Sequence, residues 1–562
     1  MRLFYSFLLS VLLLLGPATT GQTENLVGGL TPDQALKAGE RMYREGILPS
    51  GKPMQALVQG DIPVDGRMFT CRNCHLRSGL GTAEGTIISL PTNGRKLFRT
   101  LHRGAEIETN PPRHLLAKPF QSEDIRPTYT DESLADAIWT GRTPSGRELG
   151  AAMPRYLLAP PDMDILVYYL KHLSTDFSPG VDKQTLFFAT VITDEVPAKD
   201  RRSMLGVLQA YIRDHNARSR HDEKRARHGP FYRQDRFAPY RRFDLSIWEL
   251  HGPPSTWEKQ LTDYAARKPV FALLGGISTR DWTPIDNFCN KNKIPCIFPV
   301  TDHPGLNPDN WYTLYFSRGL VEEAETAARY LANNRTETVP PLLVYDNDAR
   351  SRTLTEAFIR QWTTLGQQPI RTLQLPTGTQ ARLAFWQRIL SSGQQASLVL
   401  WLQRNAMKEL FTLAPQHSAL QSLLLSWRML DSSSAGLPKA WRDKIRLTYP
   451  YRLPGQLNSR LSFVKSWLKL KKLPIENLHI QAQTYFLGWV LTGSTRMMGD
   501  DFYRDYFLDV IDMMNDEVYA IATVPRASFG AGQRYAVKGC YIVGLDEKDP
   551  AKLVPLTPWV VY

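Results

Sequence analysis

The segment VFALLGGISTRDWTPIDNFCNKNKIPCIFPVTD, residues 270–302, indicates the fold of most of this chain. It contains an apolar run (270–278), a stretch with helical periodicity (284–293) and a second apolar run (295–300). Short apolar runs bounded by turn residues are typical of buried strands, and a helix between two of them indicates a parallel sheet. We therefore predict an α/β architecture, large enough for two lobes, over residues 185–562. Further strand-like and helix-like segments alternate on either side, at 186–193, 203–215, 243–250, 255–268, 320–334, 340–347, 396–403 and 405–414.

This α/β region resembles the type 1 periplasmic binding proteins, the leucine/isoleucine/valine-binding family. The resemblance covers nearly 70% of the chain and implies a two-lobed fold with a ligand cleft between hinged lobes. It rests on the order of the elements and on the local strings VFALLGGIS (270–278), IPCIFPVTD (294–302), YFSRGLVEEAETAARYL (315–331), PLLVYDNDARS (341–351) and FGAGQRYAVKGCYIVGL (529–545).

Two pairs of polar residues follow two of the predicted strands. Ser278 and Thr279 come after the first strand of the quoted segment, and Thr301 and Asp302 come after the second. Open α/β sheets bind ligands at the carboxyl ends of their strands, and the resemblance implies a small polar ligand with its carboxylate on Ser278 and Thr279. A structural role fits equally well, in which the glycines at 275–276 permit a tight strand exit and Ser278 caps a helix. No acidic residue is evidently placed to hold a ligand amine, which argues against an amino acid.

The second informative segment is CRNCH, residues 71–75. In a C-x-x-C-H motif, Cys71 and Cys74 form thioethers with haem, and His75 binds the iron as proximal ligand. A zinc site, a redox disulfide and coincidence are the alternatives. A zinc ribbon requires a second Cys pair at suitable spacing, and a thioredoxin-like motif requires a βαβ context; the sequence nearby has neither. We predict one covalent haem c and no catalytic residue.

Residues 30–174 resemble the class I cytochrome c family over nearly their whole length. The resemblance implies an all-α fold around the haem, with Met153 of a Met-Pro turn as the distal iron ligand. His102 and His114 are the alternative distal ligands. The matching strings are TPDQALKAGERMYREGIL (31–48), CRNCHLRSGLG (71–81), AIWTGRTPSGREL (137–149), AAMPRYLLAP (151–160) and DMDILVYYLKHL (162–173).

The N-terminus indicates export. Residues 1–21 have Arg2, an apolar run (3–15) and then small residues, which predicts a cleaved signal peptide. The run is short for a membrane span, and no later stretch of about 18 apolar residues occurs. We therefore expect a periplasmic protein with no transmembrane span in the mature chain. Residues 175–184 are polar and contain Pro179 and Gly180, which predicts a linker.

Positive charge is concentrated in one segment. The formal net charge of the chain is +13. Residues 199–242 contain 13 Lys or Arg and five Asp or Glu, a local net charge of +8. Such a segment is either a solvated helix face followed by a loop or a docking patch for an acidic redox partner. Nucleic acid is not expected as a partner of an exported protein.

Three cysteines lie outside the CRNCH segment. Cys289 is near the end of a predicted helix and Cys296 begins the next strand, so in an oxidising compartment they form a disulfide or remain two buried thiols. Cys540 is expected to be a buried strand residue.

These features predict an electron carrier rather than an enzyme. Proteins that resemble the α/β region are associated with alcohol-oxidation systems that use pyrroloquinoline quinone, so the resemblance implies a quinoprotein dehydrogenase or another cytochrome as the periplasmic redox partner. The α/β region would then dock that partner or sense a small ligand. The alternative is a solute-binding protein of an ABC importer with an accessory haem domain. A haem peroxidase is a third interpretation, against which a distal Met153 argues.

Overall fold

The computed structural model describes residues 26–560 except 60, 85–86, 100, 103–124, 229–240, 306, 335–339, 393–396, 415–419, 515–522, 526, 530–531, 547 and 550–551. The predicted signal peptide (1–21) and His114 lie outside the described residues. The chain divides into two compact units, Met1–Thr175 and Asp176–Tyr562. Among the described residues, no helix is both long and apolar enough to cross a membrane.

The first unit combines helices with short strands, which differs from the all-α prediction. Its three-stranded sheet has the order β2-β1-β7, and the strands are antiparallel. Its elements are α1 (Pro32–Glu45), β1 (Gln55–Val58), β2 (Ile62–Asp65), α2 (Cys71–His75), β3 (Ala83–Glu84), β4 (Ile87–Ile88), α3 (Gly94–Leu97), β5 (Leu101–His102), β6 (Ile125–Arg126), α5 (Asp131–Trp139), β7 (Arg155–Tyr156) and α6 (Pro160–His172).

Helices α1 and α6 pack closely in this unit because one residue at the contact has no side chain. A Cβ atom on Gly39 would lie 2.4 Å from the Cβ of Tyr169 and 2.9 Å from the backbone oxygen of Ile165. The ring of Tyr169 also packs against that of Tyr43, with a centroid distance of 5.6 Å. This crossing brings the beginning and the end of the unit together around one core.

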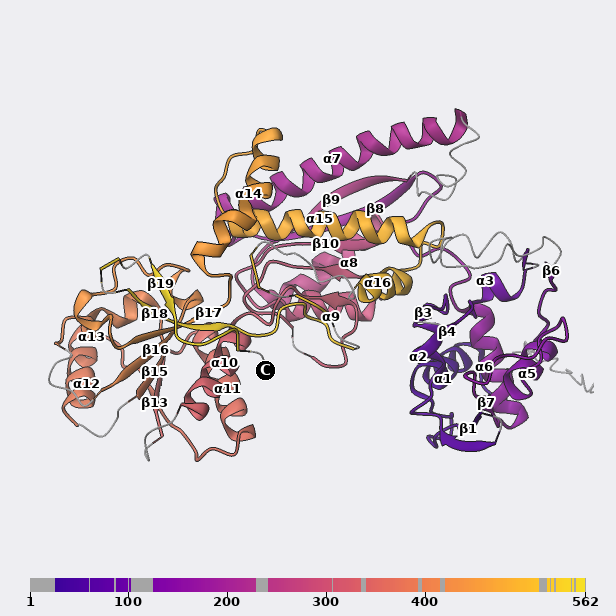
Figure 1. The fold of residues 1–562 in the computed structure, drawn as a ribbon, viewed down its shortest axis with the longest axis horizontal. Helices are drawn as coiled ribbons and strands as arrows, with labels where there is room; N and C mark the ends of the chain where they lie inside the picture. The colour runs from indigo at the N-terminus through magenta and orange to yellow at the C-terminus, as the bar shows by residue number, and fades with distance from the viewer. Residues whose placement is uncertain are drawn as a thin grey trace, which may run out of the picture. The chain divides into compact units, whose positions relative to one another are not determined.

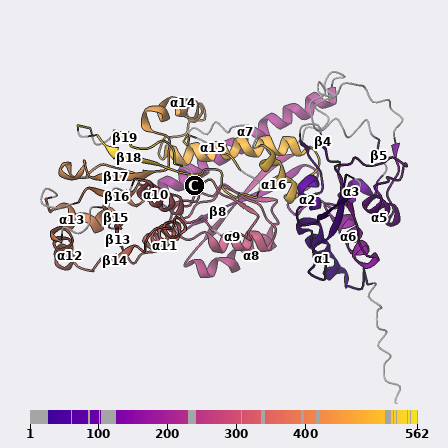
Figure 2. The same ribbon diagram turned by 60° about the horizontal axis from the view of Figure 1, so that its bottom comes forward.

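The first lobe of the second unit contains a five-stranded parallel sheet in the order β12-β11-β10-β8-β9. Helices α7 and α15 lie on one face of it, and α8 and α9 lie on the other (Figures 1 and 2). The lobe's elements are β8 (Thr185–Thr193), α7 (Ala198–His228), β9 (Arg242–Leu250), a 3-10 turn (Pro254–Thr256), α8 (Trp257–Arg267), β10 (Ala272–Leu274), α9 (Thr283–Lys291), β11 (Cys296–Ile297), β12 (Thr313–Leu314), α14 (Pro454–Leu470), α15 (Leu478–Met498) and α16 (Arg504–Met513).

The second lobe contains a seven-stranded sheet in the order β14-β13-β15-β16-β17-β18-β19, in which β18 runs antiparallel to both of its neighbours and the other pairs are parallel. Figure 1 shows α10 and α11 on one face of this sheet and α12 and α13 on the other. Its elements are α10 (Leu320–Asn333), β13 (Leu342–Tyr345), α11 (Ala349–Thr364), β14 (Arg371–Gln374), α12 (Thr379–Ser391), β15 (Ser397–Trp401), α13 (Lys408–Phe411), β16 (Ser422–Ser426), β17 (Ile445–Tyr449), β18 (Tyr541–Leu545), β19 (Leu553–Pro555) and the 3-10 turns Arg404–Met407, Arg428–Leu430 and Lys439–Trp441.

The predicted strand at 270–278 is shorter in the structure than in the sequence pattern. Its regular ladder is interrupted after Leu274, because Gly275 and Gly276 have φ angles of +61° and +95°. A Cβ atom on Gly276 would lie 2.7 Å from the ring of Trp282. The glycines interrupt the strand without turning it out of the sheet, since Ile277 forms isolated parallel bridges with Ile192 and Val300 directly after them.

Residues 176–184 of the predicted linker belong to the second unit. The hydroxyl of Ser178 accepts a hydrogen bond of 3.0 Å from the backbone N–H of Arg504, and the N–H of Ser178 donates to the carbonyl of Phe502. The guanidinium of Arg504 also donates to the carbonyl of Val270. The segment is therefore attached to the first lobe by defined contacts.

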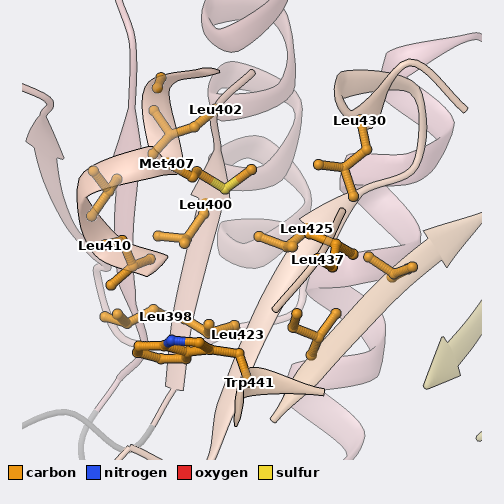
Figure 3. Close-up of a cluster of buried hydrophobic side chains, with 14 of the residues drawn as sticks. Leu398, Leu400, Leu402, Met407, Leu410, Leu423, Leu425, Leu430, Leu437 and Trp441 are labelled. Carbon is orange, nitrogen blue, oxygen red and sulfur yellow. The ribbon is translucent and has the colours of Figure 1, made fainter. Parts of the chain in front are cut away.

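The core of the second lobe is an aliphatic layer between its sheet and α12 and α13. Figure 3 shows Leu398, Leu400, Leu423 and Leu425 from two adjacent strands converging with Trp441. The strands are leucine-rich without alternation because both faces of this parallel sheet are covered.

We expect Leu423→Ala to lower the free energy of unfolding by about 2–5 kcal/mol, since it leaves a cavity in a fully buried layer. Leu470→Ala is the matched control, because Leu470 is 73% exposed and its removal should change stability by less than about 0.5 kcal/mol. Urea unfolding followed by tryptophan fluorescence measures both. Equal effects of the two substitutions would contradict the assigned core.

Candidate functional site

The carboxyl ends of the parallel strands in both lobes carry polar side chains. In the first lobe Glu195 follows β8, Ser278 follows β10 and Asp302 follows β11. In the second lobe Arg350 lies in the first turn of α11, just after β13, and Arg428 follows β16. Strand ends of this kind are where α/β sheets bind ligands.

The carboxylate of Glu195 accepts hydrogen bonds from the donors that follow β10. Its Oε1 atom accepts hydrogen bonds from the hydroxyl of Ser278 (3.0 Å) and from the backbone N–H of Thr279 (3.0 Å). Thr193, at the end of β8, donates its hydroxyl to the same oxygen at 2.6 Å. Burial alone would raise the pKa of Glu195, but the hydrogen bonds from these residues outweigh it and lower the pKa. The carboxylate is therefore held in its ionised form.

Asp302 connects the two lobes. Its carboxylate lies 2.9 Å from the Nε atom of Arg428 and 3.3 Å from the Nη2 atom of Arg350. Asp302 belongs to the first lobe and both arginines belong to the second. The side chain of Asp302 is 40% exposed and that of Arg350 is 27% exposed, so water reaches this part of the contact.

Arg428 itself is buried and has a second acidic partner. Its Nη1 atom lies 3.1 Å from Glu323 on α10 and donates to the carbonyl of Gly319 at 3.0 Å. Burial raises the pKa of Glu323, although Arg428 acts in the opposite direction. Burial likewise raises the pKa of the neighbouring Glu322 to about 8. A buried carboxylate is tolerated here only because a guanidinium faces it.

The predicted ligand residues are only partly brought together. Ser278 and Thr279 share Glu195 as a partner, whereas Thr301 turns its hydroxyl to the backbone N–H of His303 at 3.0 Å. Ser278 does not cap α9, which begins at Thr283; its hydroxyl instead accepts from the N–H of Arg280. No acidic residue was expected to be placed to hold a ligand amine; the structure places Glu195 directly against the predicted donors, where its carboxylate accepts their hydrogen bonds.

Sequence reasoning missed Glu195, Arg350 and Arg428. Glu195 could have been found, because it follows the first strand of the α/β region just as Ser278 follows a later one. Arg350 lies inside the DNDARS string that opens the second lobe. Arg428 gave no such signal, since the strand before it was not predicted.

The CRNCH segment forms a short helix, α2, and its histidine is fixed by the chain that follows. His75 is buried, and its Nδ1 atom lies 2.8 Å from the carbonyl oxygen of Leu90. Burial lowers the pKa of His75, so the ring is neutral and Nδ1 carries the donated proton. In that tautomer Nε2 holds the lone pair that binds a metal. Cys74 is exposed, and neither Cys71 nor Cys74 is in a disulfide.

The predicted distal ligand lies in the same unit. Met153 is partly buried against the core cluster that also packs against Cys71. Its carbonyl accepts a hydrogen bond of 3.0 Å from the guanidinium of Arg155. Of the alternative ligands, His102 is the last residue of β5.

The described part of the basic segment is partly neutralised within the molecule. Arg201 pairs with Glu249, and Arg202 pairs with Glu476 at 2.8 Å. Arg241 lies over the ring of Phe502. Residues 229–240 and the side chains of 220–228 lie outside the described part of the segment.

Cys289 and Cys296 are both buried thiols in the structure. Burial raises the pKa of Cys289, and the thiol of Cys296 adjoining it acts in the same direction. A disulfide between them stays a prediction. Cys540 is buried beside β18 and pairs with Val560 in an isolated β-bridge.

Comparison with protein families matches residues 241–548 to the family described as periplasmic binding protein. The match covers more than half of the 562 residues. The chain belongs to the periplasmic binding protein family. The two-lobed α/β prediction is therefore confirmed for this region, and within this binding-protein region the matched residues include Ser278, Asp302, Arg350 and Arg428.

Solved structures of other binding proteins are similar to this one at low sequence identity. A fatty acid ABC transporter substrate-binding protein from Thermomonospora curvata has a TM-score of 0.47 and 13% identity, covering 69% of this chain and 95% of its own. A branched-chain amino acid ABC transporter protein from Thermus thermophilus with bound valine has a TM-score of 0.49 and 13% identity, covering 68% of this chain and 98% of its own. Comparison with curated proteins finds no match.

In this binding protein, Arg428→Leu should lower the free energy of unfolding by about 3–5 kcal/mol at neutral pH, because it leaves Glu323 buried and unpaired. The loss should shrink as the pH falls towards about 5. A carboxyl whose folded-state pKa is raised above its ordinary value of 4.5 destabilises the folded protein when it ionises, so the penalty is present at high pH and absent at low pH.

Urea unfolding at both pH values measures this effect. Arg352→Leu is the control, because the side chain of Arg352 bonds to Asn347 in an exposed turn and should give a small, pH-independent change. An Arg428→Leu penalty that stays constant with pH would contradict the role assigned to Glu323.

Proposed function

We propose that this protein is an exported solute-binding protein that takes a small polar ligand between the two lobes of its second unit. The observation that carries the proposal is the meeting of Asp302 with Arg350 and Arg428 across the lobes, at the carboxyl ends of both sheets. Membership of the periplasmic binding protein family supports a periplasmic location and a role in binding.

The two arginines differ in what they can offer a ligand. Arg428 is buried and committed to Glu323 and to the carbonyl of Gly319, so its role is mainly structural. Arg350 is more exposed, and it contacts Asp302 at 3.3 Å and the carbonyl of Arg428 at 2.9 Å. Its Nε atom is buried without a hydrogen-bond partner. We assign ligand contact to Arg350 and Asp302, because each can exchange its present partner for a polar group of the ligand.

Uptake through an ABC importer is the role that follows from this proposal. The protein would deliver its ligand to a membrane permease, and the ion pairs of Asp302 would reform when the ligand leaves. Because an ion pair that includes a partly exposed group is weak, its exchange for ligand contacts costs little.

A thermal-shift screen of amino acids, polyamines, dicarboxylates and polyols against the full mature protein should identify a stabilising ligand. Calorimetry should then show at least about a tenfold loss of affinity in Arg350→Ala, since a hydrogen bond from a charged group contributes about 1.5–3 kcal/mol. Arg352→Ala, two residues away on the same helix and facing Asn347, should bind as the wild type does. Unchanged affinity in Arg350→Ala would contradict the assigned site, and the absence of any ligand would contradict the function.

A second function, electron transfer by a covalent haem c, is favoured by the geometry of the first unit. The residues fit this group: His75 is buried, oriented by the carbonyl of Leu90 and neutral, and the two cysteines of the motif are in thiol form. Cys71 and Cys74 would hold the haem by thioethers, His75 would bind the iron, and Met153 would be the distal ligand.

A haem held in this way accepts and donates single electrons. The protein's part is to keep the His75 ring in one orientation and one tautomer, which the 2.8 Å contact to Leu90 does. Binding of the iron by the thioether of Met153 would raise the reduction potential. The redox partner would be a periplasmic quinoprotein dehydrogenase or another cytochrome. The haem would be accessory to ligand binding, or ligand binding would respond to its redox state.

Produced with the c-type maturation machinery, the mature protein should give a haem-staining band near its full size after denaturing electrophoresis. Cys71→Ala with Cys74→Ala should abolish the band, and Cys289→Ala should retain it. Met153→Ala should remove the weak sulfur-to-iron absorption of the oxidised protein and lower the potential. A band that survives the double substitution would rule out covalent attachment at this motif.

A further inference from the structure

The side chain of Glu195 sits in a set of donors supplied by two different strand exits. Thr193 comes from the end of β8, and Ser278 and Thr279 come from the loop after β10. Their contacts with Oε1 are 2.6 Å from the Thr193 hydroxyl, 3.0 Å from the Ser278 hydroxyl, 3.0 Å from the Thr279 N–H and 3.3 Å from the Thr279 hydroxyl. Four donors therefore converge on a single oxygen atom.

This arrangement is a partly enclosed anion site. The residues Thr193 and Ser278 are 2% and 3% exposed, so the carboxylate of Glu195 replaces solvent as the partner of their hydroxyls, whereas Thr279 is exposed. The other oxygen of Glu195 is buried without a hydrogen bond, and the Nε atom of Arg280 lies 3.6 Å from it. Hydrogen bonds to an ionised acceptor are roughly twice as strong as neutral ones, so these donors favour an anion over water.

We propose that Glu195 is a tethered anion filling a carboxylate-binding site formed by Thr193, Ser278 and Thr279, so that the first lobe does not hold a ligand by a free carboxylate. A tethered group competes at an effective concentration on the order of millimolar or higher. A free carboxylate at ordinary solute concentrations cannot displace it.

The proposal has a consequence for the class of ligand, and this consequence rests on the solute-binding function proposed above. A ligand would meet the first lobe with a neutral or cationic group, because Glu195 has already used the donors after β10. Any anionic group of the ligand would turn to Arg350 in the second lobe. Simple monocarboxylic amino acids, bound by their carboxylate at Ser278, are therefore not expected as ligands.

The test uses formate as the probe and needs no knowledge of the natural ligand. In the full mature protein, Glu195→Ala removes the tethered carboxylate and leaves its donors unpaired, so the midpoint of thermal unfolding should fall by several degrees. Sodium formate at roughly 10–100 mM should recover a substantial part of that loss, because a ligand that binds only the folded state stabilises it. Sodium chloride at the same ionic strength should not.

Three further proteins make the outcome decisive. Formate should stabilise none of them more than chloride does. They are the wild type, Glu195→Gln, whose amide oxygen still fills the site, and Glu249→Ala, which removes an exposed carboxylate on β9. Glu195→Asp is the variant to use if formate does not restore the thermal midpoint of Glu195→Ala. It withdraws the carboxylate by one methylene and should gain a formate response that the wild type lacks. Equal responses of the wild type and the variants would overturn the proposal, whether or not a natural ligand is found.

Discussion

The buried guanidinium of Arg428 is the charge around which the second unit is arranged. It faces Glu323 on α10, and the other oxygen of Glu323 accepts hydroxyl hydrogen bonds from Ser426 and Thr448 at 2.6 Å each. One ion pair thereby ties the helix that enters the second lobe to the ends of β16 and β17. Since the same guanidinium also meets Asp302, the position of the first lobe's strand exits is set by the same group. Buried charges are costly unless every partner is in place, so this network admits few alternative arrangements.

The two lobes satisfy the polar groups at their strand exits in different ways. In the first lobe the donors after β8 and β10 are saturated by Glu195, a residue of the same lobe. In the second lobe Arg350 turns its guanidinium towards a carboxylate of the other lobe. The donors after β8 and β10 are therefore satisfied within the first lobe, whereas Asp302 and Arg350 depend on each other across the lobes. A solute that enters between them competes mainly with the contacts of Arg350.

The α/β part of the fold could be predicted because its strands are continuous apolar runs. The runs at 186–193, 243–250 and 396–403 correspond to β8, β9 and β15. The run at 270–278 corresponds to β10 and to the isolated bridges of Ile277, and an apolar pattern does not reveal that two glycines interrupt the strand at 275–276. Strand β17 was missed because Arg446 and Thr448 interrupt its apolar pattern. In the first unit, the pairing of β1 with β7 joins residues far apart in sequence and has no local signal.

The site was predictable only where its residues share a motif. Ser278 and Thr279 follow a recognisable strand, and His75 belongs to a five-residue signature. The partner of Ser278 lies 83 positions away along the chain, and that of Asp302 lies 48 positions away, so no local spacing could pair them. The orientation of His75 likewise depends on the backbone carbonyl of Leu90, a feature that residue type does not encode.

The closing strands of the second lobe have a consequence for how the protein matures. Strand β17 pairs with β18, and between them the chain forms α14, α15 and α16. The parallel part of the sheet thus keeps an open edge until β18 pairs with β17, and open edges template aggregation. Tyr449 and Tyr541 are partners in this pairing, so the edge is closed by a contact between residues far apart in the sequence. Contacts of this kind form slowly during folding, and the second lobe therefore exposes this edge longer than the edges that local pairings close.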